Sequence, residues 1–257
     1  MRPLAALLTL AVLVSPLSAQ RPSISDSATV GTGPTNLVLI PCFSCRWKSF
    51  EPFMERNKDR YTMLAMTALG FGGSPVPRLP INGPIPVWQQ ATIDAFVRTI
   101  VGRDLHGVTV IGHSLGGGFA AHVAARLPDR VSRVILLDAN PFSDRSWFKE
   151  DSADRRAQAD TTFIQQTANL ASADAWQRFN SPPSYAEPDR RVAIHGWFMA
   201  TSRSVVIEYW RENSLLDNNP VLAGLSMPVL DVKSISPAIS NTDSAKADRL
   251  DEWRRNG

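Results

Sequence analysis

Apolar and polar residues alternate along the first half of the chain in a pattern that predicts strands separated by helices. Short, nearly unbroken apolar runs suit strands that are buried on both faces of a sheet. The longer segments between these runs carry apolar residues at helical spacing, as at Ile93, Phe96 and Ile100. The expected strands are 36–40, 61–66, 109–111 and 131–137, and the expected helices are 47–57, 87–101 and 115–127. This alternation predicts an α/β fold with a mostly parallel sheet and helices on both faces.

The pattern changes between Asn140 and Met227, where helical stretches follow one another without a convincing strand. The stretches with helical spacing are 152–168, 171–179, 189–200 and 202–213. We interpret residues from about 141 to 200 as a helical cap inserted over the sheet, and we expect the last of the four helices to belong to the core. Beyond the cap, residues 228–232 predict one more strand and residues 242–256 one more helix.

The first residues have the composition of a secretory signal peptide. Arg2 precedes the apolar run from Leu4 to Val14, and small residues follow as far as Ala19. We expect cleavage after Ala19, a single domain over residues 20–257, and a secreted or periplasmic location. A membrane anchor is the alternative, but the run is shorter than the ~20 residues that a spanning helix needs. Stable membrane insertion after cleavage is therefore not expected.

Composition agrees with one large globular domain. The chain has 257 residues, of which 44% are hydrophobic and 20% charged, which allows a substantial buried core. The 27 lysines and arginines outnumber the 24 acidic residues by only three, and they are scattered along the chain. Binding to nucleic acid is therefore not indicated.

The two cysteines, Cys42 and Cys45, form a Cys-x-x-Cys pattern. In an exported protein a disulfide between them would persist, although a bridge across so short a loop is geometrically demanding. A local disulfide and two free thiols both remain open, and a redox-active role is not expected. Zinc is not expected, because the chain has no second pair at ligand spacing.

Residues 108–120 join a β-branched run to an Ala-rich helix through the pattern Gly112-x-Ser114-x-Gly116. The two glycines allow a turn tight enough to hold the serine hydroxyl at the carboxyl end of the strand. A glycine-rich strand-to-helix turn without catalytic function is the alternative. In this context we interpret the pattern as a nucleophile elbow.

Several motifs together resemble the α/β-hydrolase superfamily, in particular its capped esterases and lipases. Besides the elbow, these motifs are Pro41-Cys42-Phe43-Ser44, Gly70-Phe71-Gly72-Gly73-Ser74, Leu127-Pro128-Asp129-Arg130-Val131 and Leu225-Ser226-Met227-Pro228-Val229-Leu230. The resemblance implies that Ser114 is the nucleophile and that no metal or organic cofactor takes part.

The resemblance also implies an oxyanion hole and a catalytic acid. The oxyanion donors would be the backbone N–H groups of Leu115 and Phe43. The acid would be Asp138, which ends the strand 131–137, or Asp243, which follows the late strand. Asp138 is alternatively a buried aspartate that binds nearby loop amides, and Asp243 a residue at a helix N-terminus.

The histidines depart from the family pattern, in which the catalytic histidine follows the acid. The chain has four: His106, His113, His122 and His195. His106 precedes the elbow strand, His113 lies inside the elbow, and His122 lies two helical turns beyond it. His195 falls in the expected cap, where we interpret it as structural or cap-lining. We therefore expect this chain to be C-terminally truncated relative to the family, without its last strand, last helix and catalytic histidine.

The complete protein is thus expected to be a secreted serine hydrolase that acts on a small molecule, an apolar carboxylic ester, with activity impaired in the 257 residues given. Hydrolysis of C–C or amide bonds and acyl transfer remain open, because the same elbow serves all of them. A non-catalytic binding protein is the alternative outside enzymes. Aromatic residues of the cap region would line an apolar pocket or simply pack on the core: Trp147, Phe148, Phe163, Trp176, Trp197, Phe198 and Trp210.

Overall fold

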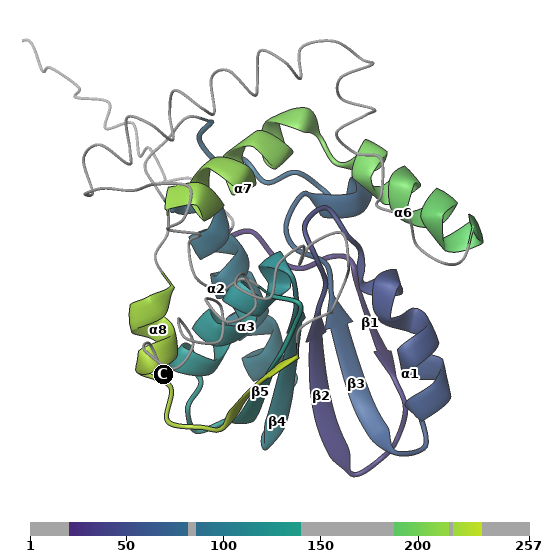
Figure 1. The fold of residues 1–257 in the computed structure, drawn as a ribbon, viewed down its shortest axis with the longest axis vertical. Helices are drawn as coiled ribbons and strands as arrows, with labels where there is room; N and C mark the ends of the chain where they lie inside the picture. The colour runs from purple at the N-terminus through teal and green to yellow at the C-terminus, as the bar shows by residue number, and fades with distance from the viewer. Residues whose placement is uncertain (1–20, 82–85, 140–187, 216–217, 233–257) are drawn as a thin grey trace, which may run out of the picture.

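A computed structural model describes residues 21–81, 86–139, 188–215 and 218–232 (Figure 1). The expected signal peptide and the helices expected at 152–168, 171–179 and 242–256 lie outside the described residues. The same holds for Asp243 and for the expected aromatic residues of the cap between 147 and 176.

The described residues contain a six-stranded sheet in the order β1-β3-β2-β4-β5-β6. Its strands are β1 (Ser27–Val30), β2 (Thr35–Ile40), β3 (Tyr61–Met66), β4 (Val108–His113), β5 (Val131–Leu137) and β6 (Val229–Val232). β1 pairs antiparallel with β3, and all other neighbouring pairs are parallel. The prediction of a mostly parallel sheet is confirmed, and the expected strand at 228–232 is its edge strand β6.

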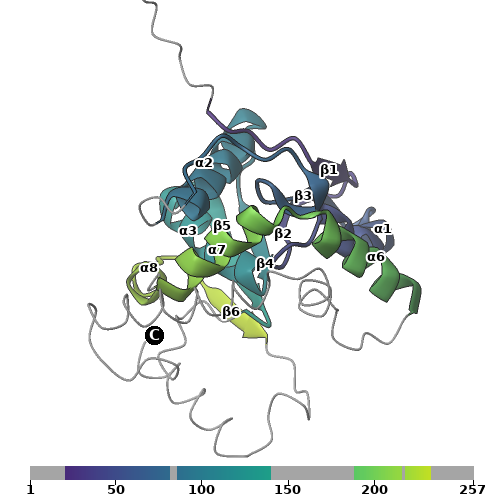
Figure 2. The same cartoon turned by 90° about the horizontal axis from the view of Figure 1, so that it is seen from above.

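Helices cover both faces of this sheet. The described helices are α1 (Glu51–Asn57), α2 (Val87–Gly102), α3 (Leu115–Arg126), α6 (Pro188–Ala200), α7 (Arg203–Leu215) and α8 (Asn219–Ala223), and the short 3-10 turns are η1 (Trp47–Phe50) and η2 (Phe71–Gly73). α2 and α3 lie on one face and α1 on the other, while α7 crosses the end at which the parallel strands finish (Figures 1 and 2). Within the described residues no helix is both long enough and apolar enough to cross a membrane.

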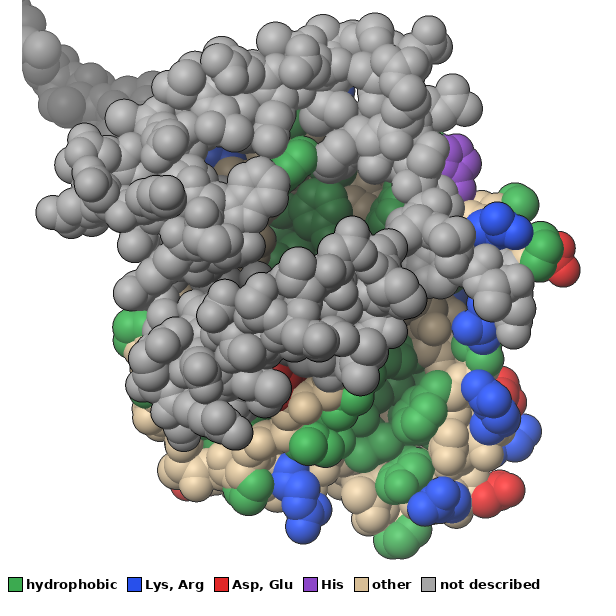
Figure 3. Space-filling model, in the orientation of Figure 1, with side chains coloured by type: hydrophobic (Ala, Val, Ile, Leu, Met, Phe, Trp, Pro, Cys, Tyr) green, Lys and Arg blue, Asp and Glu red, His purple; other side chains and the backbone are tan. Residues whose placement is uncertain are grey.

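The sheet separates two hydrophobic clusters. The larger one lies under α2, α3 and α7 and includes Phe96, Phe119 and Tyr209, which are almost fully buried. Burying a side chain of this size stabilises the fold by about 1.5–3 kcal/mol. The smaller cluster lies under α1 and includes Leu39 and Met54. Hydrophobic side chains also gather on the face of the molecule that Figure 3 presents.

Buried polar contacts, as well as apolar ones, hold α7 in place across the end of the sheet. The Tyr209 hydroxyl donates to the carbonyl of Leu69 at 3.0 Å. The Glu212 carboxylate accepts the backbone N–H groups of Trp88 and Gln89, at 2.8 and 2.7 Å. These amides lie in the first turn of α2, where they have no partner within the helix. Burial raises the pKa of Glu212, even though the two amide bonds oppose this change.

Candidate active site

Ser114 occupies the sharp turn between β4 and α3, at the carboxyl end of a strand inside the sheet. Its backbone has φ 53° and ψ −122°, a region that residues other than glycine rarely adopt. Its amide donates to the carbonyl of Leu137 at 3.0 Å, and its carbonyl accepts the amide of Gly117 at 2.9 Å. The half-buried serine is therefore held on a strained turn by the neighbouring strand and by its own helix.

The glycines around Ser114 are required by close backbone contacts. A β-carbon on Gly112 would overlap the backbone of Gly116, and one on Gly116 would overlap the carbonyl oxygen of Ile40. A β-carbon on Gly117 would overlap the side chain of Ala139 after β5. The glycines thus let α3 start directly against the ends of β2 and β5, which fixes the direction of the helix relative to the sheet.

The two expected oxyanion donors belong to segments that meet at this point. Leu115 is the first residue of α3, so its N–H has no acceptor within the helix. Phe43 follows β2 in a four-residue turn, in which the amide of Cys45 donates to the carbonyl of Cys42 at 3.0 Å. The contact of Gly116 with the end of β2 brings this turn next to the start of α3.

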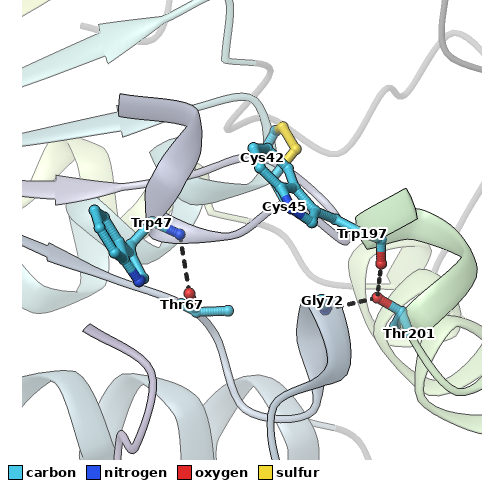
Figure 4. Close-up of a disulfide and its surroundings, with 7 residues drawn as sticks. All are labelled: Cys42, Cys45, Trp47, Thr67, Gly72, Trp197 and Thr201. Carbon is cyan, nitrogen blue, oxygen red and sulfur yellow. Dashed lines mark hydrogen bonds between the residues drawn. A yellow bond between two sulfur atoms is a disulfide. The ribbon is translucent and has the colours of Figure 1, made fainter. Parts of the chain in front are cut away.

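The turn that carries Phe43 is closed by a disulfide. Cys42 and Cys45 are bonded to each other, with their Cα atoms 5.1 Å apart (Figure 4). Of the two alternatives that the sequence left open, the structure has the disulfide. Within the turn Ser44 has φ 55°, and its buried hydroxyl has no hydrogen-bond partner among the described residues.

Asp26 anchors the chain directly after this turn. Its carboxylate accepts hydrogen bonds from Arg46, at 2.9 and 2.7 Å, from the Trp47 indole at 3.1 Å and from the Thr67 hydroxyl at 2.6 Å. The Thr67 hydroxyl in turn accepts the backbone amide of Trp47 at 2.9 Å (Figure 4). Sequence reasoning missed this network, because an aspartate in a Ser- and Thr-rich lead-in has no pattern that distinguishes it from a solvated one.

Asp138 lies immediately after β5, beside the elbow. Its amide donates to the carbonyl of Val232 at 2.7 Å, and its backbone has φ 45°. The side chain is exposed, and its charge is close enough to act on the imidazole of His113. The structure therefore places this candidate acid at the same edge of the sheet as Ser114.

The four histidines lie at different places around the fold. His106 is exposed before β4, at the opposite end of the strand from Ser114, and its ring contacts Asp104 at 3.2 Å. His122 on α3 contacts the side chain of Asn218 at 2.8 Å, and burial lowers its pKa. Burial also lowers the pKa of His113, against the opposing charge of Asp138. His195 lies on α6.

The described residues contain no group of three or more histidine, cysteine, aspartate or glutamate side chains that could hold a metal ion. The groups that converge at the end of β4 are a strained serine, backbone N–H groups and one nearby carboxylate. The backbone N–H groups of such a set can stabilise negative charge on an oxygen atom, which is a requirement of acyl transfer.

Comparison with known proteins gives a family match over most of the chain. A family model described as the alpha/beta hydrolase fold matches residues 35–231. Among solved structures, a hydrolase from Oleispira antarctica superposes with a TM-score of 0.66 at 17% identity, covering 82% of this chain and 76% of that one. At this identity the likeness concerns the fold.

Two curated relatives match shorter regions. The lipase LipV of Mycobacterium tuberculosis is 30% identical over 153 residues, which are 53% of this chain and 58% of the lipase. A Mycobacterium phage D29 protein, whose name refers to non-heme haloperoxidases, is 33% identical over 113 residues, which are 44% of this chain and 38% of the phage protein. The chain thus spans about half the length of these two relatives.

Proposed function

Because the chain belongs to the alpha/beta hydrolase fold family, we propose that it is a serine hydrolase that cleaves carboxylic esters through an acyl-enzyme on Ser114. The observation that carries the proposal is the backbone of Ser114, with φ 53° and ψ −122° at the end of β4. Strain of this kind persists only where the surrounding structure imposes it. Here it holds the hydroxyl at the edge of the sheet where ligands bind in α/β folds.

The proposed reaction uses the groups around this serine. The Ser114 Oγ attacks the ester carbonyl, and the N–H groups of Leu115 and Phe43 stabilise the negative charge on the carbonyl oxygen. A histidine accepts the serine proton and passes it to the leaving alcohol, and Asp138 or Asp243 orients that histidine. Water then releases the acid from Ser114.

We further propose that the 257 residues given turn over esters slowly. His122 is engaged with Asn218, and His106 lies at the far end of β4. Without a histidine that accepts its proton, the serine hydroxyl is a weak nucleophile. These positions also favour the second candidate, a binding protein of the same fold that has no catalytic activity.

The proposed substrate is a small apolar ester. The rings of Phe43 and Phe71 pack edge to face with their centroids 5.4 Å apart, and the ring centroids of Phe71 and Tyr209 are 4.5 Å apart. Phe71 and Tyr209 are almost fully buried, so the half-buried Phe43 of the proposed oxyanion turn is the ring of this group that is left to contact an apolar acyl or alcohol group. Residues 1–19 support the further proposal that the protein is exported.

The experiment is hydrolysis of p-nitrophenyl esters of increasing acyl length by the wild type, Ser114→Ala and Ser132→Ala. Ser132 is a matched control, because it is exposed on β5 at the other end of the sheet. The proposal expects turnover that Ser114→Ala abolishes and Ser132→Ala retains. It also expects a fluorophosphonate probe to modify Ser114 in the intact protein. Equal rates for all three proteins, with no labelling of Ser114, would instead support the binding protein.

A further inference from the structure

The Cys42–Cys45 disulfide encloses the residue whose backbone N–H is the proposed second oxyanion donor. Phe43 is the first residue between the two cysteines, and the amide of Cys45 closes the same turn on the carbonyl of Cys42 at 3.0 Å. The direction of the Phe43 N–H therefore depends on whether this turn stays closed.

Two features show that the sequence of the turn does not favour its closed shape. Ser44 has φ 55°, which is unfavourable for a residue with a side chain. Its hydroxyl is buried and has no hydrogen-bond partner among the described residues, which adds a desolvation cost. The disulfide holds the turn against these costs, together with the hydrogen bond between Cys45 and Cys42 and the packing of Phe43 on Phe71.

The chain on both sides of the turn is anchored independently of the disulfide. Before the turn, β2 is paired on both sides, and its last carbonyl lies against Gly116. After the turn, Arg46 is bound to Asp26, and the amide of Trp47 is bound to Thr67. Opening the disulfide would therefore change the turn while β2 before it and η1 after it stay in place.

We propose that the Cys42–Cys45 disulfide is a redox-controlled positioning element of the oxyanion turn, so that its reduction by a dithiol lowers the rate of the chemical step. This inference rests on the proposed function of Ser114. Both cysteines are buried, with Cys42 8% and Cys45 1% exposed, so we expect the reductant to attack the less deeply buried Cys42 first. In the view of Figure 4 the side chain of Trp197 on α6 points toward Cys42 and Cys45.

The reduction is a balanced two-electron exchange. A thiolate of the dithiol attacks the Cys42 Sγ, the S–S bond breaks, and Cys45 leaves as a thiolate that takes up a proton. The second thiol of the reductant then attacks the mixed disulfide and releases Cys42 as a thiol. The reductant leaves as its own disulfide, and the protein has gained two electrons and two protons.

The test compares the oxidised and the dithiothreitol-reduced wild type with Cys42→Ser/Cys45→Ser. The chain has two cysteines, so counting free thiols measures this bond alone. We expect reduction to expose two thiols and to lower kcat at least about tenfold, and at most by the ~10²–10³ that complete loss of an oxyanion donor costs. KM should change less than about twofold, because the ground-state ester does not need the donor. The double variant should show the low kcat with and without dithiothreitol. Reoxidation of the reduced wild type should restore its original kcat.

If the disulfide serves stability alone, its reduction lowers the melting temperature and leaves kcat unchanged well below that temperature. Unchanged kcat in protein with two free thiols would therefore overturn the inference, and so would a folded protein whose disulfide resists dithiothreitol.

If oxidised protein has no turnover that depends on Ser114, the proposed function has failed. Amide exchange then tests the turn: reduction should speed exchange at Cys45 at least about tenfold and leave Gly117 unchanged, and equal exchange at Cys45 overturns the inference.

Discussion

Gly116, at the start of α3, lies directly against the carbonyl oxygen of Ile40, at the end of β2. A β-carbon on Gly116 would overlap this oxygen and that of Pro41. The contact is between two backbones, so neither side can move away as a flexible side chain would. It connects the helix that follows the proposed nucleophile to the strand that precedes the proposed oxyanion turn.

Replacing Gly116 by alanine should therefore destabilise the protein by about 1–3 kcal/mol, the usual cost of overpacking. Gly118→Ala is the matched control, because its β-carbon would meet the flexible side chain of Asn218 at 3.4 Å. In a helix this second change should be neutral or stabilising by up to about 1 kcal/mol. Urea unfolding of both variants measures the difference, and equal effects would mean that the contact with Ile40 adjusts at no cost.

Ser114 is expected to reduce the stability of the fold because its backbone is strained. Ser114→Gly and Ser114→Ala both remove the hydroxyl, but only glycine adopts φ 53° without steric strain. Ser114→Gly should therefore unfold at a higher temperature than Ser114→Ala, by the equivalent of about 1 kcal/mol. Because both variants lack the hydroxyl, calorimetry makes the comparison independent of activity. A less stable glycine variant would contradict the argument from strain.

The anchor at Asp26 should make stability depend on pH at the acid end. Burial acts to raise the pKa of Asp26, but hydrogen bonds from Arg46 and Thr67 and the charge of Arg46 outweigh it, so the pKa is lowered. A carboxyl group with a lowered pKa stabilises the folded state above its unfolded pKa, and this contribution is lost as the pH falls through the folded pKa.

Asp26→Asn should therefore cost about 1–2 kcal/mol at neutral pH, and its difference from the wild type should close as the pH falls below about 4. Asp104→Asn is the control. Asp104 contacts Arg130 and His106 in ion pairs at 3.1 and 3.2 Å, but it is fully exposed, so little change is expected. Denaturant unfolding from pH 3 to 7 measures both variants. A constant difference between Asp26→Asn and the wild type would contradict the assignment.

The fold followed from the sequence wherever periodicity carried the signal. The strands at 61–66 and 131–137 and the helix at 188–200 have bounds close to those that the apolar spacing predicts. The position of Ser114 followed in the same way, because a glycine-flanked serine between a strand and a helix is a local pattern. A local pattern predicts the structure correctly when the fold buries the same face of the element on which the sequence places apolar residues.

Other features were decided only by tertiary structure. Whether Cys42 and Cys45 bond depends on the conformation of the turn between them, and the anchor at Asp26 depends on how segments far apart in the sequence meet. The same holds for Glu212, which binds the start of α2 from more than a hundred residues away. The sequence by itself determined the elbow, the alternating elements and the family, since each depends on residues that are close together in the chain. The contacts that surround Ser114 were decided by the tertiary structure, because contacts between remote segments produce no periodic pattern along the chain.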